Sequence, residues 1–171
     1  MSDIQRINAW FDGFDREFSQ IIPTVVAETA TEYFQERFVT QEWDGIPWPS
    51  LSPGYASRKS RGRGRILTAS GTLQRSIAPT IVTPNRVVIS AGNARSPYAR
   101  VHNEGLRITG VRQVGAYTNS NFMGRGKPVK IPAHQRSVDF KMPQRQFIGT
   151  SKFLNQAIRD RLIAAYNARQ R

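Results

Sequence analysis

The chain of 171 residues contains no cysteine, only two histidines and few acidic residues outside its N-terminal part. The lack of cysteine excludes disulfide bonds, thiolate metal sites and cysteine nucleophiles. Nine of the twelve Asp and Glu residues lie within residues 1–45, so the rest of the chain does not favour the carboxylate pair of a glycosidase. No P-loop, dinucleotide-binding glycine pattern or G-x-S-x-G motif occurs. We therefore expect no enzymatic activity, no cofactor and no metal site.

Long apolar runs are also missing. No stretch approaches the roughly 18–20 apolar residues of a membrane-spanning helix, and the N-terminal residues do not have the pattern of a secretion signal. We expect a soluble protein without a membrane partner, made and kept in a cytoplasm. The length is enough for one domain with a buried core.

The net charge of +13 is unevenly distributed along the chain. Residues 1–45 hold three bases and nine acids, a net charge of −6, whereas residues 46–171 hold 22 bases and three acids, a net charge of +19. This asymmetry indicates that the basic part meets a negative partner. Nucleic acid, an acidic protein surface and the N-terminal segment of a neighbouring copy all fit this description.

The spacing of apolar residues predicts the main helices. Apolar residues from Ile4 to Ile21 recur every three or four positions, and a similar pattern follows Pro23. Because proline suits the first turn of a helix, we predict two tandem amphipathic helices over residues 3–40. After the final P-x-R-x-F segment, apolar residues at helical spacing from Leu154 to Tyr166 predict a last helix.

The sequence pattern in the middle of the chain predicts strands and loops. Residues 43–55 alternate Pro and Gly with Trp43 and Trp48, which predicts a loop packed on the core. Residues 76–92 predict an antiparallel strand pair around a Pro-Asn turn. In residues 98–105 the character of the side chains alternates from one position to the next, which is typical of a strand, and the segment ends in glycine.

The order of these elements predicts an α+β fold with two N-terminal amphipathic helices, an antiparallel β-sheet with a long inserted arm or hairpin, and a C-terminal helix. We expect a single domain over residues 1–171. Within it, residues 1–42 form the helical segment, residues 43–106 and 143–171 the core, and residues 107–142 an extended arm or insertion. This arm need not be ordered in an isolated subunit.

Two local patterns invite a catalytic interpretation that the sequence does not support. On a strand, His102 and Glu104 would project to one face with no further ligand nearby, so we interpret them as a surface polar pair beside a turn at Gly105. Ser70 has neither the flanking glycine of a nucleophile elbow nor an Asp and His signal. His134 lies in a basic segment without an obvious partner.

A basic tract precedes the segment ILTASGTLQRSI. Its cations could contact several phosphates, with a steep salt dependence; they are Arg58, Lys59, Arg61, Arg63 and Arg65. No aromatic residues interleave the tract to stack bases, and no helix-turn-helix, zinc-finger or ribonucleoprotein motif is present. Composition alone leaves DNA binding and self-assembly around a negative partner equally open.

Four sequence blocks in a fixed order resemble the phage virion morphogenesis family, which includes the tail-completion proteins of Mu-like and P2-like phages. The blocks are WPSLSPGYASRK, ILTASGTLQRSI, YARVHNEG and MPQRQFIGTS, spread over roughly residues 43–155. The matching residues are Trp48 and Leu51; Ile66, Leu67, Ser70, Gly71, Leu73, Ser76 and Ile77; Tyr98, Ala99, His102 and Gly105; and Pro143, Arg145, Phe147 and Gly149.

The resemblance implies a structural virion protein that completes the head-proximal end of the tail and joins head to tail at the neck. We expect it in the neck or tail of the virion, and in the host cytoplasm during assembly. The alternative is a basic DNA-binding protein of packaging or genome organisation. We interpret the matched residues as fold determinants, with Leu67, Leu73, Ile77 and Phe147 buried and Arg145 free to pair.

The implied partners are copies of the chain in a ring, adjacent neck, connector or tail-terminator proteins, and passing genomic DNA bound without sequence preference. We hypothesise that the acidic helical segment of one subunit, through Glu28, Glu32 and Glu36, faces the basic sheet of the next or an acidic adjacent ring. The basic tract at residues 58–65 would contact an acidic partner, and the arm would dock on the tail tube or connector.

Overall fold

The computed structural model describes residues 3–54, 56, 65–120 and 128–169, and its dominant element is one long helix, α1, from Asp3 to Thr40. The predicted break at Pro23 is wrong, because α1 continues through this residue. A proline inside a helix removes one backbone hydrogen bond and crowds the preceding turn, at a cost of about 3 kcal/mol. The residues after Pro23 pack into the core, and this burial holds the helix together across the proline.

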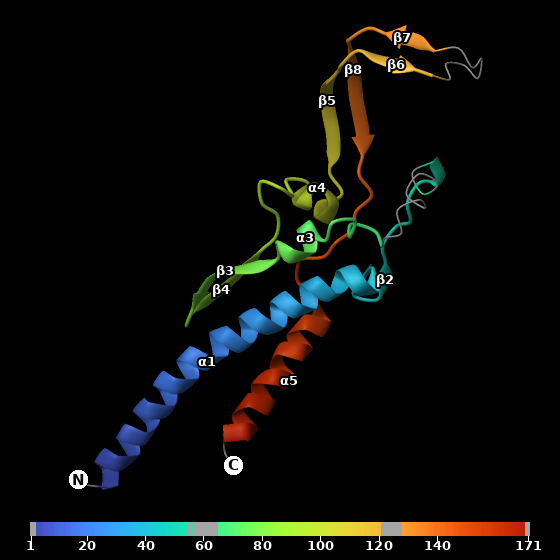
Figure 1. Ribbon diagram of the computed structural model, residues 1–171. Coiled ribbons are helices and arrows are strands. Elements are labelled where there is room, and N and C mark those ends of the chain that lie inside the picture. The colour runs from blue at the N-terminus through green and yellow to red at the C-terminus, as the bar shows by residue number, and fades with distance from the viewer. Residues whose placement is uncertain (1–2, 55, 57–64, 121–127, 170–171) are drawn as a thin grey trace.

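The last helix, α5, spans Lys152–Arg169 and lies beside the C-terminal half of α1, running in the opposite direction (Figure 1). Leu154 on α5 is buried and Ile158 packs against the same core. Arg161 joins the two helices by donating to the carboxylate of Glu32. No helix in the described part of the chain is long and apolar enough to cross a membrane.

Aromatic side chains from three distant segments form the centre of the core. Phe38 near the end of α1 is fully buried, 5.4 Å from the Trp48 ring and 5.1 Å from the Phe147 ring between centroids. The indole Nε1 of Trp48 donates to the carbonyl oxygen of Gln146 at 2.7 Å. Leu73 completes this cluster with 0% exposure. Trp48 therefore packs its loop on the core.

The short strands flank this core in separate pairs. Residues Glu42–Trp43 (β1) pair with Ile46–Pro47 (β2), and Ala78–Thr83 (β3) pairs antiparallel with Arg86–Ser90 (β4). Each sheet within the described residues has two strands, so there is no single large sheet. The α+β class is confirmed, with helices at both ends of the chain and antiparallel pairs between them.

The inserted arm is a β-hairpin. Arg107–Val114 (β5) and His134–Lys141 (β8) pair antiparallel along their whole length, and Tyr117–Asn119 (β6) pairs with Val129–Ile131 (β7) further along it. Figure 1 shows the arm projecting from the core on the side away from α1 and α5. The predicted arm or hairpin is confirmed.

Two short helices sit between the core and the arm: α3 over Thr72–Arg75 and α4 over Ala99–Glu104. The strand expected over residues 98–105 is wrong. Gly105 adopts a left-handed conformation with φ of 67° and ends α4, and the Leu106 amide bonds back to the Val101 carbonyl at 3.1 Å. Alternation over the eight residues 98–105 is too short to distinguish a strand from a helix.

Candidate assembly surface at the base of the arm

A buried arginine ties the base of the arm to the Trp48 loop. Arg145 is only 4% exposed; its Nε donates to the Pro49 carbonyl at 3.0 Å and its Nη2 to the Ser50 carbonyl at 3.1 Å. Its backbone amide donates to the His102 carbonyl at 2.8 Å. Burial lowers the pKa of its guanidinium from the ordinary value. The expectation that Arg145 is free to pair is therefore wrong.

The amide of Asn103 connects α4 to the strand-like segment that follows the arm. Its Oδ1 accepts from the Phe147 amide at 2.9 Å and from the Ile148 amide at 3.0 Å. A second hydrogen bond joins the same two segments, because the Gln144 Nε2 donates to the Asn103 backbone carbonyl at 3.1 Å. Our sequence reasoning overlooked Asn103, although an amide inside the His-Asn-Glu triplet was the available signal.

Gly105 allows the two ends of the arm to approach each other. A Cβ atom at this position would lie 2.8 Å from the Gln144 Cβ and 3.1 Å from its Cα. Directly beside it, the Met142 amide donates to the Leu106 carbonyl at 3.0 Å and closes the hairpin at its root. These contacts fix where the arm leaves the core.

His102 faces the interior of this region rather than forming a surface pair with Glu104. Its ring packs edge-on against Tyr98 with centroids 5.8 Å apart, and its Nδ1 is a buried atom with no hydrogen-bond partner within the described residues. Burial, and then the charge of Arg145, lower the pKa of the imidazole. Glu104 instead pairs with Arg100 at 3.0 Å. The predicted His102 and Glu104 pair is wrong because α4 is a helix.

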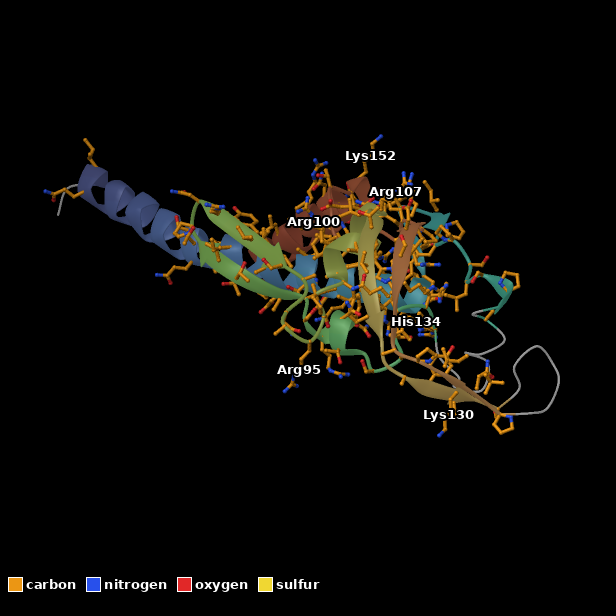
Figure 2. All side chains as sticks on the ribbon, turned by 90° about the horizontal axis from the view of Figure 1, so that it is seen from above. Arg95, Arg100, Arg107, Lys130, His134 and Lys152 are labelled. Carbon is orange, nitrogen blue, oxygen red and sulfur yellow. The ribbon has the colours of Figure 1, made fainter. Side chains whose placement is uncertain are left out.

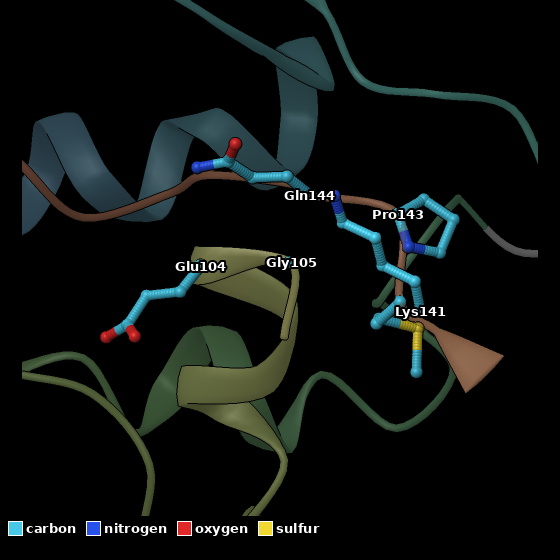
Figure 3. A pocket seen from close by; sticks show the side chains of 6 residues that line it. Glu104, Gly105, Lys141, Pro143 and Gln144 are labelled. Carbon is cyan, nitrogen blue, oxygen red and sulfur yellow. The ribbon is translucent and has the colours of Figure 1, made fainter. Parts of the chain in front are cut away.

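A shallow hollow opens between α4 and the root of the arm (Figure 3). Glu104 lies on one side of it and Lys141 and Pro143 on the other, and Met142 and Gln144 also line it. It contains no nucleophile beside a base, and no cluster of three potential metal ligands occurs among the residues that the structure describes. The hollow offers contact surface and no recognisable chemistry.

The block from Ile66 to Ile77 packs on the core beside the C-terminal part of α1. Gly71 has φ of 65° at the start of α3, and the Ser70 hydroxyl lies 2.9 Å from that of Thr72. Leu73 and Ile77 are fully buried. In addition, Leu67 packs half-buried against the core with φ of 61°. The segment is an architectural turn whose apolar side chains anchor it.

A family model described as the phage virion morphogenesis family matches residues 2–167. The chain belongs to this family. The match extends well beyond the four sequence blocks and takes in both α1 and the arm. No curated protein and no solved structure matches the chain.

Membership of the virion morphogenesis family gives the chain a structural part in building the phage particle. It indicates a virion-associated protein, in agreement with the resemblance of the four blocks. The matched residues Trp48, Gly105 and Arg145 of this family member hold the segments at the arm base together, and Gly71 begins α3. Leu51 is half-buried and Gly149 has φ of 158°.

The described basic residues of this morphogenesis protein come from several elements. Figure 2 shows Arg100 on α4, Arg107 and Lys130 on the arm, and Lys152 on α5. Four of the five cations of the basic tract lie outside the described residues: Arg58, Lys59, Arg61 and Arg63. Arg65 is described and exposed.

The acidic residues proposed for assembly line an exposed edge of α1, but two of them also have partners in the same chain. Glu32 pairs with Arg161, and Glu36 lies 3.2 Å from Arg37. Glu28 is exposed and forms no ion pair within the described residues. Glu28 is therefore the carboxylate of this set that is most available to another molecule.

Proposed function

We propose that the chain completes the head-proximal end of the phage tail and mediates head–tail joining at the neck. Family membership supports a structural role in the virion, and the resemblance of the four blocks points to tail completion. The assembly site would be the neck or tail, reached from the host cytoplasm. Repeated subunit contacts around a ring would supply the affinity, because many weak equivalent interfaces act together.

The observation that carries this proposal is the arm, which exposes apolar side chains far from the core. Val111 is 64% exposed, Tyr117 50% and Phe140 46%. Such residues on a projecting hairpin are typical of a surface that a partner covers. Val111 and Phe140 lie on opposite faces of the hairpin, and Gly105 and Arg145 fix its root, so both faces are presented in a defined direction. We assign the tail tube or connector as docking partner to the face that contains Val111.

The test removes the arm without disturbing the core. Because the Met142 amide already bonds to the Leu106 carbonyl, an Asn-Gly turn can replace residues 107–141. The shortened protein should fold, as judged by a cooperative thermal transition, and should fail to restore infectious particles in a phage that lacks the gene. Electron micrographs should show filled heads and tails that remain separate. Normal head–tail joining by the shortened protein would refute the arm's role.

The basic composition supports the alternative of DNA binding in packaging or genome organisation. The net charge of +13 would make any such binding salt-dependent. An electrophoretic shift assay with duplex DNA separates the two roles. Tight binding at near-physiological salt would favour the alternative, whereas a neck protein does not require it.

A further inference from the structure

The two faces of the arm differ in charge. Side chains alternate between the faces of a hairpin, and residues paired across it share a face. One face, here called the cationic face, is made of Ile108, Gly110, Arg112 and Val114 on β5 and His134, Arg136, Val138 and Phe140 on β8. The opposite face carries Arg107 and Lys141 together with the only acid of the described arm, Asp139, whose carboxylate accepts two bonds from Arg107, both at 2.7 Å.

The cationic face has no such compensation. Arg112 and Arg136 are direct partners in the register and both are exposed. Neither forms an ion pair within the described residues. Like charges directly opposite each other destabilise an antiparallel pair, so this arrangement works against the stability of the free arm. A partner that places carboxylates over the pair would remove the repulsion.

A notch lies next to this pair of arginines. Gly110 faces Val138 across the hairpin, and a Cβ atom at Gly110 would meet nothing within 4 Å. No packing within the chain explains a glycine there, although glycine weakens the interior of a strand. Such a glycine often marks close approach by another backbone. Beyond the notch, the exposed ring of Phe140 offers an apolar contact.

We propose that the cationic face docks on the acidic edge of α1 in a second copy of the chain. This edge consists of Ile21, Thr24, Val25, Glu28 and Glu32, which share one side of the helix by their spacing. Thr24, Glu28 and Glu32 are exposed, and Ile21 and Val25 are half-buried. The proposal rests on the proposed function and names the surfaces that join neighbouring subunits.

The two surfaces match in spacing as well as in charge. Residues four apart on a helix have Cβ atoms about 5–6 Å apart, close to the roughly 5 Å across the hairpin, so Glu28 and Glu32 fit Arg112 and Arg136. Glu32 would share its carboxylate between the incoming arginine and Arg161 of its own chain. Because the glutamates follow one another along the helix axis and the arginines face each other across the strands, α1 of the second copy crosses the hairpin at a steep angle.

The contact forms between copies and not within one. The arm projects away from α1 on the other side of the core (Figure 1). A contact between two different surfaces is heterologous, so each subunit both gives and receives an arm. Repetition of this contact closes a ring or extends a filament, which supplies the ring expected of a neck protein.

Cross-linking tests the contact directly, because the native chain has no cysteine to compete. A copy carrying Val114→Cys is mixed with a copy carrying Thr24→Cys, and a short bismaleimide is added. Gln113→Cys, on the adjacent residue but the opposite face, replaces Val114→Cys in the control. Mixed dimers should form at least about tenfold faster with Val114→Cys than with the control, because docking raises the effective concentration.

Charge exchange provides the second test. Arg112→Glu with Arg136→Glu should weaken self-association in sedimentation at least about tenfold, and Glu28→Arg with Glu32→Arg in the other copy should restore it. Arg86→Glu, the same charge reversal at a single arginine of β4, should leave it unchanged. Gly110→Val should raise thermal stability and weaken self-association.

Equal cross-linking from both faces of the arm would overturn the proposal. The proposal would also be overturned if Arg112→Glu with Arg136→Glu left self-association intact but abolished binding to duplex DNA. The arm would then be a nucleic-acid contact. These results are separable from the proposed function. If the helix contact fails while arm deletion still blocks head–tail joining, the arm docks on a different virion protein and the neck role stands.

Discussion

Replacing Arg145 by methionine should destabilise the protein without affecting any charge on its surface. Methionine keeps an apolar stem but removes the two donors to the Pro49 and Ser50 carbonyls. Hydrogen bonds to a charged group contribute about 1.5–3 kcal/mol each. Because Pro49 and Ser50 are exposed and their carbonyls can be hydrated again, we take the lower end and expect a loss of about 3 kcal/mol in total.

For a chain of this length such a loss corresponds to a fall in Tm of about 6–12 °C, which differential scanning calorimetry would measure. Arg145→Lys keeps the charge but offers a single point donor in place of the fork, so its Tm should lie between those of the methionine variant and the parent. Arg86→Met, at an exposed site on β4, is the control and should change stability by less than about 0.5 kcal/mol. A Tm for the methionine variant within about 2 °C of the parent would refute the stabilising role of the two hydrogen bonds from Arg145.

Three further changes test the core, the root of the arm and the buried imidazole. Phe38→Ala should lower the free energy of unfolding in urea by about 3–5 kcal/mol, because it empties a fully buried site between two aromatic rings; Val39→Ala, on the exposed neighbour, is the control. Gly105→Ala should cost about 2–3 kcal/mol, since its φ is left-handed and its Cβ would meet Gln144; an unchanged Tm would contradict this contact. The pKa of His102 is lowered in the folded state, so the unfolded state binds the proton more tightly. Stability should therefore be full above the ordinary pKa of about 6.5 and fall as the pH drops from there toward the lowered value. His102→Gln should flatten this slope in thermal melts between about pH 5 and 8, and an equal slope in both proteins would place its origin elsewhere.

Long, regular patterns in the sequence were sufficient to predict most elements. The periodicity of α1 and α5, the alternation of β3 and β4 and the position of the arm are all local properties. The errors arose where local pattern competes with distant packing. Pro23 reads as a helix start, yet burial of the following turns carries α1 through it.

The role of Arg145 could not be predicted from neighbouring residues. Its hydrogen-bond partners, Pro49 and Ser50, are more than ninety residues away in sequence. The same applies to the arm, where Arg112 and Arg136 are visible in the sequence but their direct pairing depends on the register. Contacts that need the fold to bring distant segments together leave no periodic signal.

The positions of the sequence blocks along the chain match the positions of the residues that stabilise the fold. The block ending at Gly105 and the block beginning at Met142 flank the arm, and their residues make the core and the root contacts. The side chains of β5 and β8 take no part in the buried core. Substitutions on the arm can therefore change its partner with little effect on the fold. The uncompensated pair Arg112 and Arg136 fits this division, because a core segment could not keep such repulsion without a loss of stability.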